Sequence, residues 1–291
     1  MYGKFRNVSG FSFRFIFYHQ KELVLKRSGL VIIITLQNNI FSGLFVGQNL
    51  LTLKEVDSTN NFLKNILSNS KPLPEGTVIM AEHQYAGRGQ QDNKWLSEPG
   101  KNLTFSVLLK PSFINVVNQF DLTRAISVGV CDTLRTVLGN GVKIKWPNDI
   151  YYNDRKLGGM LIENMVQGER INNSVVGIGL NVNQDSFSEG AGNATSVKQI
   201  LHKDYDLRLL LSEICSQIEA YYLHLKAGRI YFVRNAYLQR LYWLNEPRRY
   251  RAHDAIFTGV IEGVADNGLL QVKRDGTTTS YNLKEIEFLN K

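Results

Sequence analysis

Residues 142–163 read VKIKWPNDIYYNDRKLGGMLIE, a pattern that predicts three successive strands, at 142–146, 149–152 and 157–163. Pro147 has no amide hydrogen for a strand ladder, so it separates the first strand from the second. The turn residues between the second and third strands are typical of a hairpin. The stretch therefore predicts neighbouring strands, and it places polar residues where one strand gives way to the next.

The flanking sequence mixes further strands with helices. Apolar residues recur at helical spacing through 121–138 until Gly139-Asn140-Gly141 ends the helix, and two more helices are expected at about 206–226 and at 230–243. Other runs read as strands, at 51–56, 77–81, 103–109 and 174–182. No internal repeat occurs, so this part of the chain is expected to form one unit of mixed strands and helices.

The pattern changes past Pro247. Short strand-like runs at 256–260, 269–272 and 281–283 are separated by Asp266-Asn267-Gly268 and Arg274-Asp275-Gly276. Aspartate or asparagine followed by glycine favours tight hairpin turns, because these residues tolerate positive φ. Residues 246–291 are therefore expected to form a small antiparallel barrel, with a boundary near residue 245.

Net charge alone does not identify a partner. The 291 residues carry a formal charge of +8, but residues 1–50 hold six basic residues and one acidic residue, so the rest of the chain carries only +3. The basic excess lies mainly in residues 1–45, an aromatic-rich and irregular N-terminal extension. Its most apolar run, 30–36, is read as a strand or an irregular extension. It is too short to cross a bilayer, since a membrane-spanning helix needs roughly 20 residues.

Two cysteines, Cys131 and Cys215, lie far apart in the sequence, with no Cys-x-x-Cys pair and no histidine cluster near them. This spacing favours neither a disulfide nor a structural metal cluster, and the cytoplasm is the expected location.

The most informative polar segment is 81–95, which leaves a strand and enters a loop containing Gly87-Arg88-Gly89. Glycines let a backbone approach a ligand closely, and an arginine offers donors suited to phosphate or carboxylate. The side chain of Trp95 would form an apolar wall against a ligand. The segment is not a P-loop, because no Gly-Lys-Ser/Thr follows. A flexible surface loop with a solvated arginine would account for the same composition equally well.

Three further segments carry candidate site residues. Asp149 follows the first strand of the opening stretch, and its carboxylate would either hold a magnesium ion or cap a turn. Lys156 lies at the end of the hairpin, where it would either contact a ligand or be solvated. Glycines inside the strand 174–182 would allow a ligand, or a neighbouring part of the sheet, to lie close to the backbone. Asp57-Ser58-Thr59 at a helix start suits a polar ligand or a simple cap.

In this order, the segments resemble the biotin–protein ligases, also called biotin–[acetyl-CoA-carboxylase] ligases or holocarboxylase synthetases. The resemblance covers about residues 46–291. Each motif is weak alone, but several in the right order are specific. The matching pieces are Asp57-Ser58-Thr59-Asn60, Gln84, Gly87-Arg88-Gly89, Trp95, Lys145-Trp146-Pro147-Asn148-Asp149, Arg155-Lys156-Leu157-Gly158-Gly159 and Gly179-Leu180-Asn181.

The resemblance implies an α+β fold: a mixed sheet flanked by helices, related to the class II aminoacyl-tRNA synthetase core, at 46–245, and an SH3-like barrel at 246–291. It implies that biotin and ATP form biotinyl-5′-AMP and that biotin then passes to a lysine of a biotin carboxyl carrier protein. Arg88, Lys156 and magnesium near Asp149 would supply the positive charge that this chemistry needs.

The resemblance also implies two sets of ligand contacts. The nucleotide would be bound by Arg88, Lys94, Asn148 and Asn181. Biotin would be bound by Ser58, Thr59, Asn60, Gln84, Gly87, Arg88, Gly89, Gln90, Trp95, Lys156, Gly158 and Gly159. The chain departs from the family after Gly89, where Gln90-Gln91-Asp92-Asn93 replaces more basic residues. With fewer cations in this segment, Arg88 and Lys94 are expected to contribute more of the electrostatic binding of the phosphates.

Three alternatives are weighed against this interpretation, the first of them from the same superfamily. A lipoate–protein ligase shares the catalytic core, but the loop around Arg88 and the hairpin around Lys156 favour biotin. A dual ligase and repressor needs an N-terminal winged helix, for which residues 1–45 are too short and irregular, so DNA binding is not expected. Membrane binding is not expected either. A non-catalytic biotin-binding protein would not require Asp149 and Lys156. Exposed strands in the core would support a homodimer.

Overall fold

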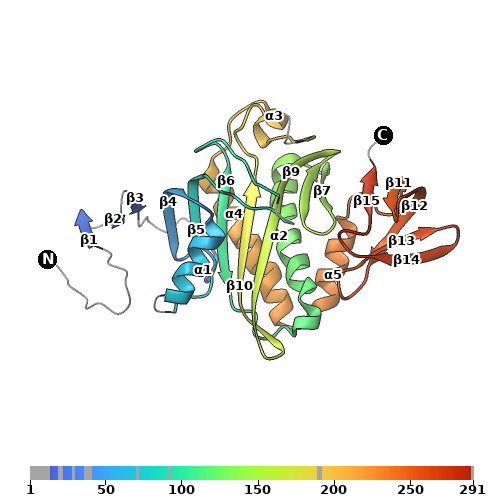
Figure 1. The fold of residues 1–291 in the computed structure, drawn as a ribbon, viewed down its shortest axis with the longest axis horizontal. Helices are drawn as coiled ribbons and strands as arrows, with labels where there is room; N and C mark the ends of the chain where they lie inside the picture. The colour runs from blue at the N-terminus through green and yellow to red at the C-terminus, as the bar shows by residue number, and fades with distance from the viewer. Residues whose placement is uncertain are drawn as a thin grey trace.

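The computed structural model describes residues 14–18, 22–27, 30–35, 41–69, 72–90, 93–188 and 192–289. The described residues form a ten-stranded sheet and a five-stranded sheet, with helices packed against the larger one (Figure 1). The larger sheet is antiparallel except for the parallel pair β4 (Leu50–Val56) and β5 (Val78–Gln84). The expected mixed sheet flanked by helices is therefore confirmed.

The strand order of the larger sheet is β1-β2-β3-β4-β5-β6-β10-β9-β8-β7. Antiparallel neighbours joined by short turns account for β7 to β10, and the opening stretch predicts the first three of these strands. The remaining strands of this sheet are β1 (Arg14–Tyr18), β2 (Glu22–Arg27), β3 (Leu30–Thr35), β6 (Leu103–Leu109), β7 (Val142–Lys145), β8 (Asp149–Tyr152), β9 (Arg155–Gln167) and β10 (Arg170–Leu180).

Strand alternation sends the buried side chains of the sheet into two clusters, one on each face. On β6, Phe105 and Val107 belong to the larger cluster, whereas Leu108 belongs to the smaller one beneath α1 (Thr59–Asn69). The larger cluster also contains buried residues of α2 (Phe120–Leu138), α4 (Leu207–Lys226) and α5 (Ile230–Gln239). The short elements η1 (Val116–Asn118) and α3 (Val197–Leu201) complete the helices of the described chain.

The five-stranded sheet has the order β14-β13-β12-β11-β15. Both predicted Asx-Gly turns join antiparallel neighbours, because they connect β12 to β13 and β13 to β14. The strand expected at 281–283 lies mostly beyond β14, and strands β11 and β15 were not predicted. The bounds are β11 (Pro247–Ala252), β12 (Ala255–Val264), β13 (Leu270–Arg274), β14 (Thr277–Tyr281) and β15 (Glu287–Leu289).

Buried polar contacts join the two sheets. Arg124 of α2 is 1% exposed, and its guanidinium donates to the carbonyls of Val264, Ala265 and Asp266 at the β12–β13 turn. The Nε1 of Trp146 donates to the carbonyl of Gly268 at 2.8 Å. These bonds place the smaller sheet beside the end of β7, where the polar residues of the opening stretch lie.

Several boundaries differ from the sequence prediction. The helix expected at 230–243 ends at Gln239, and the strands expected at 157–163 and 174–182 begin earlier, as the long hairpin of β9 and β10. Of the two interpretations of 30–36, a strand or an irregular extension, the structure has the strand, β3, with residue 36 outside the described residues. Phe41 is buried in the larger cluster, so the packed core includes residues that the sequence assigns to the extension.

Candidate active site

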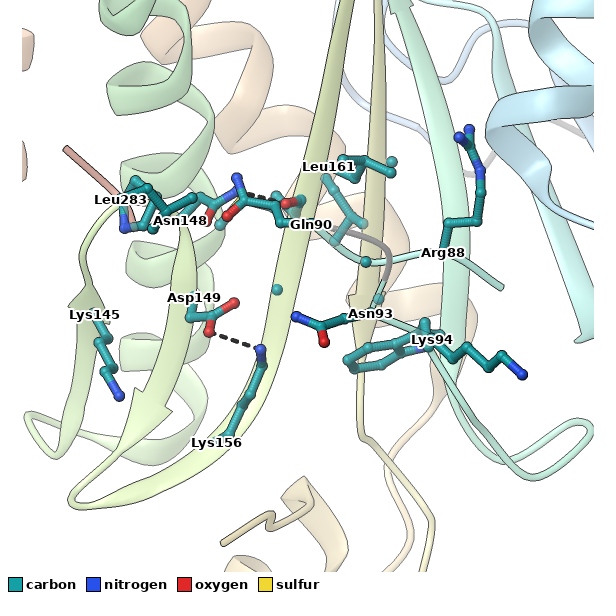
Figure 2. A pocket seen from close by; sticks show the side chains of 18 of the residues that line it. Arg88, Gln90, Asn93, Lys94, Lys145, Asn148, Asp149, Lys156, Leu161 and Leu283 are labelled. Carbon is teal, nitrogen blue, oxygen red and sulfur yellow. Dashed lines mark hydrogen bonds and ion pairs between the residues drawn. The ribbon is translucent and has the colours of Figure 1, made fainter. Parts of the chain in front are cut away.

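A cavity of about 570 Å³ opens on the face of the sheet that α1 covers, beside the five-stranded sheet (Figure 2). It is bounded by the start of α1, the 84–95 loop, the strands β8 to β10 and the segment before and within β15. The residues that line it are Ser58, Thr59, Asn60, Gln84, Arg88, Gly89, Gln90, Asn93, Lys94, Trp95, Lys145, Trp146, Pro147, Asn148, Asp149, Lys156, Gly159, Met160, Leu161, Gly177, Ile178, Gly179, Leu283, Ile286, Glu287 and Phe288.

The start of α1 supplies a set of neutral polar groups at one end of the cavity. The Oε1 of Gln84 accepts from the backbone N–H of Thr59 at 2.7 Å and from its hydroxyl at 3.1 Å. The Ser106 hydroxyl donates to the Oδ1 of Asn60 at 2.6 Å. Because Ser58, Thr59 and Asn60 are each 3% exposed, this end of the cavity holds uncharged donors and acceptors in fixed positions.

Two glycines of β10 make room for side chains that build the cavity wall. A Cβ atom on Gly177 would lie 2.5 Å from the Oδ1 of Asn60. A Cβ atom on Gly179 would lie 2.5 Å from the Cε2 of Trp95. Strand glycines weaken a sheet unless something must approach its backbone, and here an amide and an indole do.

The charged centre of the cavity is the ion pair between Lys156 and Asp149. The Nζ of Lys156 lies 2.7 Å from the Oδ2 of Asp149, and both side chains are about one-third exposed to the cavity (Figure 2). A Cβ atom on Gly159 would lie 2.6 Å from the Oδ1 of Asp149, so this glycine leaves space for the carboxylate. Asn148, which is 3% exposed, donates to the carbonyl of Met160 at 2.5 Å.

A second cation lies between the two sheets. The Nζ of Lys145 lies 4.8 Å from the ring centroid of Tyr151 and 5.0 Å from that of Phe288, and it donates to the Tyr151 hydroxyl at 3.2 Å. Burial lowers the pKa of Lys145 from its ordinary value, and the charge of Asp149 partly offsets this effect. The face of each ring attracts the ammonium, so the two rings hold Lys145 at the border of the cavity.

Arg88 is paired with a carboxylate beside the cavity. Its Nη2 donates to the two carboxylate oxygens of Glu163 on β9, at 2.9 and 3.1 Å. Figure 2 shows its guanidinium directed away from the Asp149–Lys156 pair. Burial acts to raise the pKa of Glu163, but hydrogen bonds from Lys64 and Asn60 and the charge of Arg88 hold it below its usual value.

Comparison with known proteins identifies the family. Residues 53–181 match the model of the biotin/lipoate A/B protein ligase family. The chain is 30% identical over 250 residues to the bifunctional ligase/repressor BirA of Bacillus spizizenii, which covers 83% of this chain and 73% of that protein. The chain belongs to the biotin–protein ligase family.

Two further comparisons agree with this assignment. The biotin–[acetyl-CoA-carboxylase] ligase of Paracoccus denitrificans is 28% identical over 224 residues, which is 75% of this chain and 91% of that protein. The structure of the Aquifex aeolicus biotin protein ligase in complex with biotin and ATP is 28% identical, with a TM-score of 0.70, over 84% of this chain and 100% of that chain. The expectation of a ligase enzyme is thus confirmed.

Most of the residues assigned by resemblance to the biotin–protein ligases line the cavity together, but three do not. Gly158 lies against β10, because a Cβ atom there would meet the carbonyl of Gly179 at 2.5 Å. Gly87 lies against the carbonyl of Trp95, also at 2.5 Å from such an atom. Asn181 donates to the carbonyl of Thr195 and fixes a neighbouring loop. Their ligand contacts stay predictions, and Gln91 and Asp92 lie outside the described residues.

Sequence reasoning missed the contribution of the smaller sheet to this ligase cavity. Leu283, Ile286, Glu287 and Phe288 line it, although they lie more than 100 positions from the other motifs. No local pattern marks these residues as ligand contacts. Lys145 was quoted within a motif but given no role, and only its position between Tyr151 and Phe288 singles it out.

Neither of the two cysteines is among the described residues that line the cavity. Cys131 and Cys215 are buried and unpaired, and burial raises the pKa of Cys131 to about 12. The described part of the chain contains no group of three side chains of the His, Cys, Asp or Glu type placed to hold a metal. Among the helices that the structure describes, none combines the length and the apolar character needed to cross a membrane.

Proposed function

We propose that this chain activates biotin with ATP as biotinyl-5′-AMP and transfers the biotinyl group to a lysine of a biotin carboxyl carrier protein. The observation that carries the proposal is the single cavity with neutral amides and hydroxyls at one end and Lys145 and Lys156 at the other. The first end suits an uncharged ring and the second suits phosphates. The biotin and ATP bound by the Aquifex aeolicus relative support this division.

The neutral end would recognise the ureido ring of biotin. This ring has N–H donors and a carbonyl acceptor, which match the side chains of Ser58, Thr59 and Asn60. The Gln84 carbonyl already holds Thr59, so the pocket is in place before the ligand arrives. Trp95 on the backbone of Gly179 would cover the apolar part of the molecule.

The cationic end would allow two anions to react. A carboxylate oxygen of biotin attacks the α-phosphorus of ATP, the bond to the β-phosphate oxygen breaks, and pyrophosphate leaves. Repulsion between the carboxylate and the phosphates opposes this step, so positive charge near both groups lowers its barrier. Lys156 would lie between the carboxylate and the α-phosphate, and Lys145 and Lys94 would bind the nucleotide with Asn148.

Asp149 fits the expected magnesium site in part. It supplies one carboxylate at the cavity surface, and magnesium is commonly held by one or two carboxylates together with substrate phosphates. Bound there, the ion would neutralise phosphate charge. The paired Lys156 would keep the free carboxylate neutralised and orient it toward the nucleotide.

The second half of the reaction needs only an approaching amine. The lysine Nζ of the carrier attacks the acyl carbon of the mixed anhydride, the bond to the phosphate oxygen breaks, AMP leaves, and the amine loses a proton to solvent. We infer a carboxyl carrier domain as acceptor because the Paracoccus denitrificans relative is a biotin–[acetyl-CoA-carboxylase] ligase. The cytoplasm, where ATP is made and used, is the proposed location.

DNA binding is a separate question, because BirA of Bacillus spizizenii is a ligase and a repressor. The parts of residues 1–40 that the structure describes are the strands β1 to β3, whereas a winged helix needs helices in sequence. We therefore propose a ligase without repressor activity. A gel-shift assay with DNA upstream of its own gene, at several salt concentrations, tests this, and a sequence-specific shift would contradict it.

The main experiment is incubation with ATP, magnesium, biotin and a carboxyl carrier domain, followed by mass spectrometry of the acceptor lysine. We expect addition of one biotinyl group, and its loss in the Asp149→Asn and Lys156→Ala variants. Circular dichroism shows whether the variants remain folded. A parallel reaction with lipoate separates the two branches of the family, and modification by lipoate but not biotin would overturn the proposal.

A further inference from the structure

The segment between α5 and β11 bonds to both sheets. The N–H of Ile144 in β7 donates to the carbonyl of Arg240 at 2.8 Å, and the N–H of Tyr242 donates to the carbonyl of Ile144 at 2.8 Å. Further along the segment, the N–H of Asn245 donates to the carbonyl of Ile261 in β12 at 2.9 Å. The segment therefore fixes the edge of the larger sheet against the smaller one by backbone hydrogen bonds.

Trp243, in the middle of this segment, has a backbone conformation that bulky residues seldom adopt. Its φ is 62°, in the left-handed region, where a large side chain is strained. Consecutive side chains of an extended chain point to opposite sides, whereas the rings of Tyr242 and Trp243 are stacked with their centroids 4.6 Å apart. Strain of this kind persists only where the surrounding contacts enforce it. The left-handed backbone thus brings together two rings that an extended backbone would separate.

These two rings belong to an arc of aromatic side chains that ends at Lys145. The ring of Tyr242 lies 5.3 Å from that of Tyr151, and the ring of Trp243 is stacked on that of Phe288 at 5.6 Å. Tyr151 and Phe288 are the two rings whose faces hold the Lys145 ammonium. The arc therefore passes from one side of the ammonium to the other, and Trp243 joins its part beside the larger sheet to the ring in the smaller sheet.

Ring contacts, rather than hydrogen bonds, hold the indole of Trp243 in place. The side chain is 6% exposed, and its Nε1 has no hydrogen-bond partner among the described residues. The guanidinium of Arg248 lies 4.8 Å from the indole, and the ring of Tyr250 meets it edge-on at 6.3 Å. Trp243 is not among the described residues that line the cavity, so it reaches the site through Phe288 and Tyr242.

We propose that Trp243 is a positioning residue for the binding of ATP, which keeps Phe288 and Tyr151 at the separation that holds Lys145 at the border of the cavity. Lysine has a flexible four-carbon stem, so an ammonium is fixed only by contacts on more than one side. The indole supplies them indirectly, because it spaces the two rings. The position of the smaller sheet thereby affects the affinity for the nucleotide. This inference rests on the proposed function, because that function assigns Lys145 to ATP.

The test is steady-state kinetics with ATP and biotin varied in turn, in the wild type, Trp243→Leu and Trp243→Phe. We expect Trp243→Leu to raise the ATP KM about threefold to fivefold, within the contribution of one aromatic pair, and to leave the biotin KM unchanged. Trp243→Phe keeps a ring that can stack on Phe288, so it should restore most of the affinity for ATP. A general loss of structure would raise both KM values.

A double variant tests whether Trp243 acts through Phe288. Since both changes remove the same contact with Lys145, Trp243→Leu combined with Phe288→Leu should have an ATP KM close to that of Phe288→Leu alone. If the two fold-changes multiply instead, the residues act independently, and this result would overturn the inference.

Phe257→Leu is the matched control. Phe257 is 8% exposed and packs against Tyr250 and Tyr281 within the smaller sheet. Within the part of the chain that the structure describes, its ring contacts do not include either ring that holds Lys145. This variant should lower the free energy of unfolding in urea and leave the ATP KM unchanged.

If Trp243→Leu does not fold, Tyr242→Leu removes the neighbouring ring of the arc and should raise the ATP KM in its place. An unchanged ATP KM in whichever of these two variants folds, or an equal rise in the biotin KM, would overturn the inference and leave the proposed function intact. A wild-type enzyme that forms no biotinyl-AMP would instead refute the proposed function.

Discussion

The indole of Trp95 lies directly on the backbone of Gly179, so that a Cβ atom on this glycine would fall 2.5 Å from the Cε2 of the ring. The contact joins a residue at the end of the polar loop to the middle of the sheet. It fixes one wall of the cavity by packing rather than by a hydrogen bond. A methyl group at this position cannot be accommodated unless the ring moves.

Gly179→Ala should therefore displace Trp95 and weaken biotin binding. We expect the KM for biotin to rise about tenfold, which corresponds to about 1.4 kcal/mol, with a much smaller change for ATP. Steady-state kinetics with each substrate varied in turn measures this. Gly263→Ala is the control, because its added Cβ atom would meet only the flexible end of Gln271 at 3.1 Å. An unchanged biotin KM in Gly179→Ala would contradict the assigned wall.

Arg88→Gly should release reactive biotinyl-AMP into solution. Removing the side chain breaks the tie to Glu163 and adds backbone freedom to a loop that already contains Gly87 and Gly89. The measurement is biotin incorporated into a bystander protein, which we expect to exceed the wild-type level severalfold. Equal bystander labelling by both enzymes would refute loop closure as the means of retention.

Phe288→Leu should weaken ATP binding even though Phe288 belongs to the smaller sheet. The ring lies 5.0 Å from the Nζ of Lys145, and such a contact contributes about 0.5–2 kcal/mol. We expect the ATP KM to rise about threefold to tenfold while the biotin KM is kept, and Phe288→Tyr, which retains a ring, to behave like the wild type. A change in biotin KM alone would show that the ring serves the other end of the cavity.

As the pH is raised, the ATP KM should begin to increase at a lower pH than it would if the pKa of Lys145 had its ordinary value. Burial lowers the pKa of Lys145, so its positive charge is lost as pH rises through this lowered value. In the window between the lowered pKa and the ordinary one, unfolding takes up a proton, so stability rises with pH while ATP binding falls. Kinetics from about pH 7 to about pH 10 measure the effect, which Lys145→Arg should remove because arginine stays charged.

Arg124→Met should destabilise the whole chain rather than the chemistry. The buried guanidinium donates to Asp121 at 2.6 Å and to three carbonyls of the β12–β13 turn. Loss of these bonds leaves buried acceptors without a donor, at an expected cost of about 3–5 kcal/mol. Urea unfolding measures this loss. Arg135→Met, which removes an exposed bond to Asn140, should change stability by less than about 0.5 kcal/mol.

The sequence by itself determined the features that depend on near neighbours. Turn chemistry placed the hairpins of the opening stretch and the Asx-Gly turns of the smaller sheet. Helical spacing placed 121–138 to within one residue of α2. The order of the motifs indicated the family, and the motifs contained most of the residues that line the cavity. These features follow from backbone preferences and periodicity, which act over a few residues.

The tertiary structure alone decided which distant groups meet. Glu163 pairs with Arg88 across 75 positions, and Phe288 covers Lys145 from a different sheet. β11 went unpredicted because its charged residues hide the strand pattern. Asn181, which the motif assigns to the nucleotide, donates to the carbonyl of Thr195 in a neighbouring loop. Such contacts depend on the register and packing of whole elements, so a carboxylate that pairs with a distant arginine has the same local sequence as one that faces water.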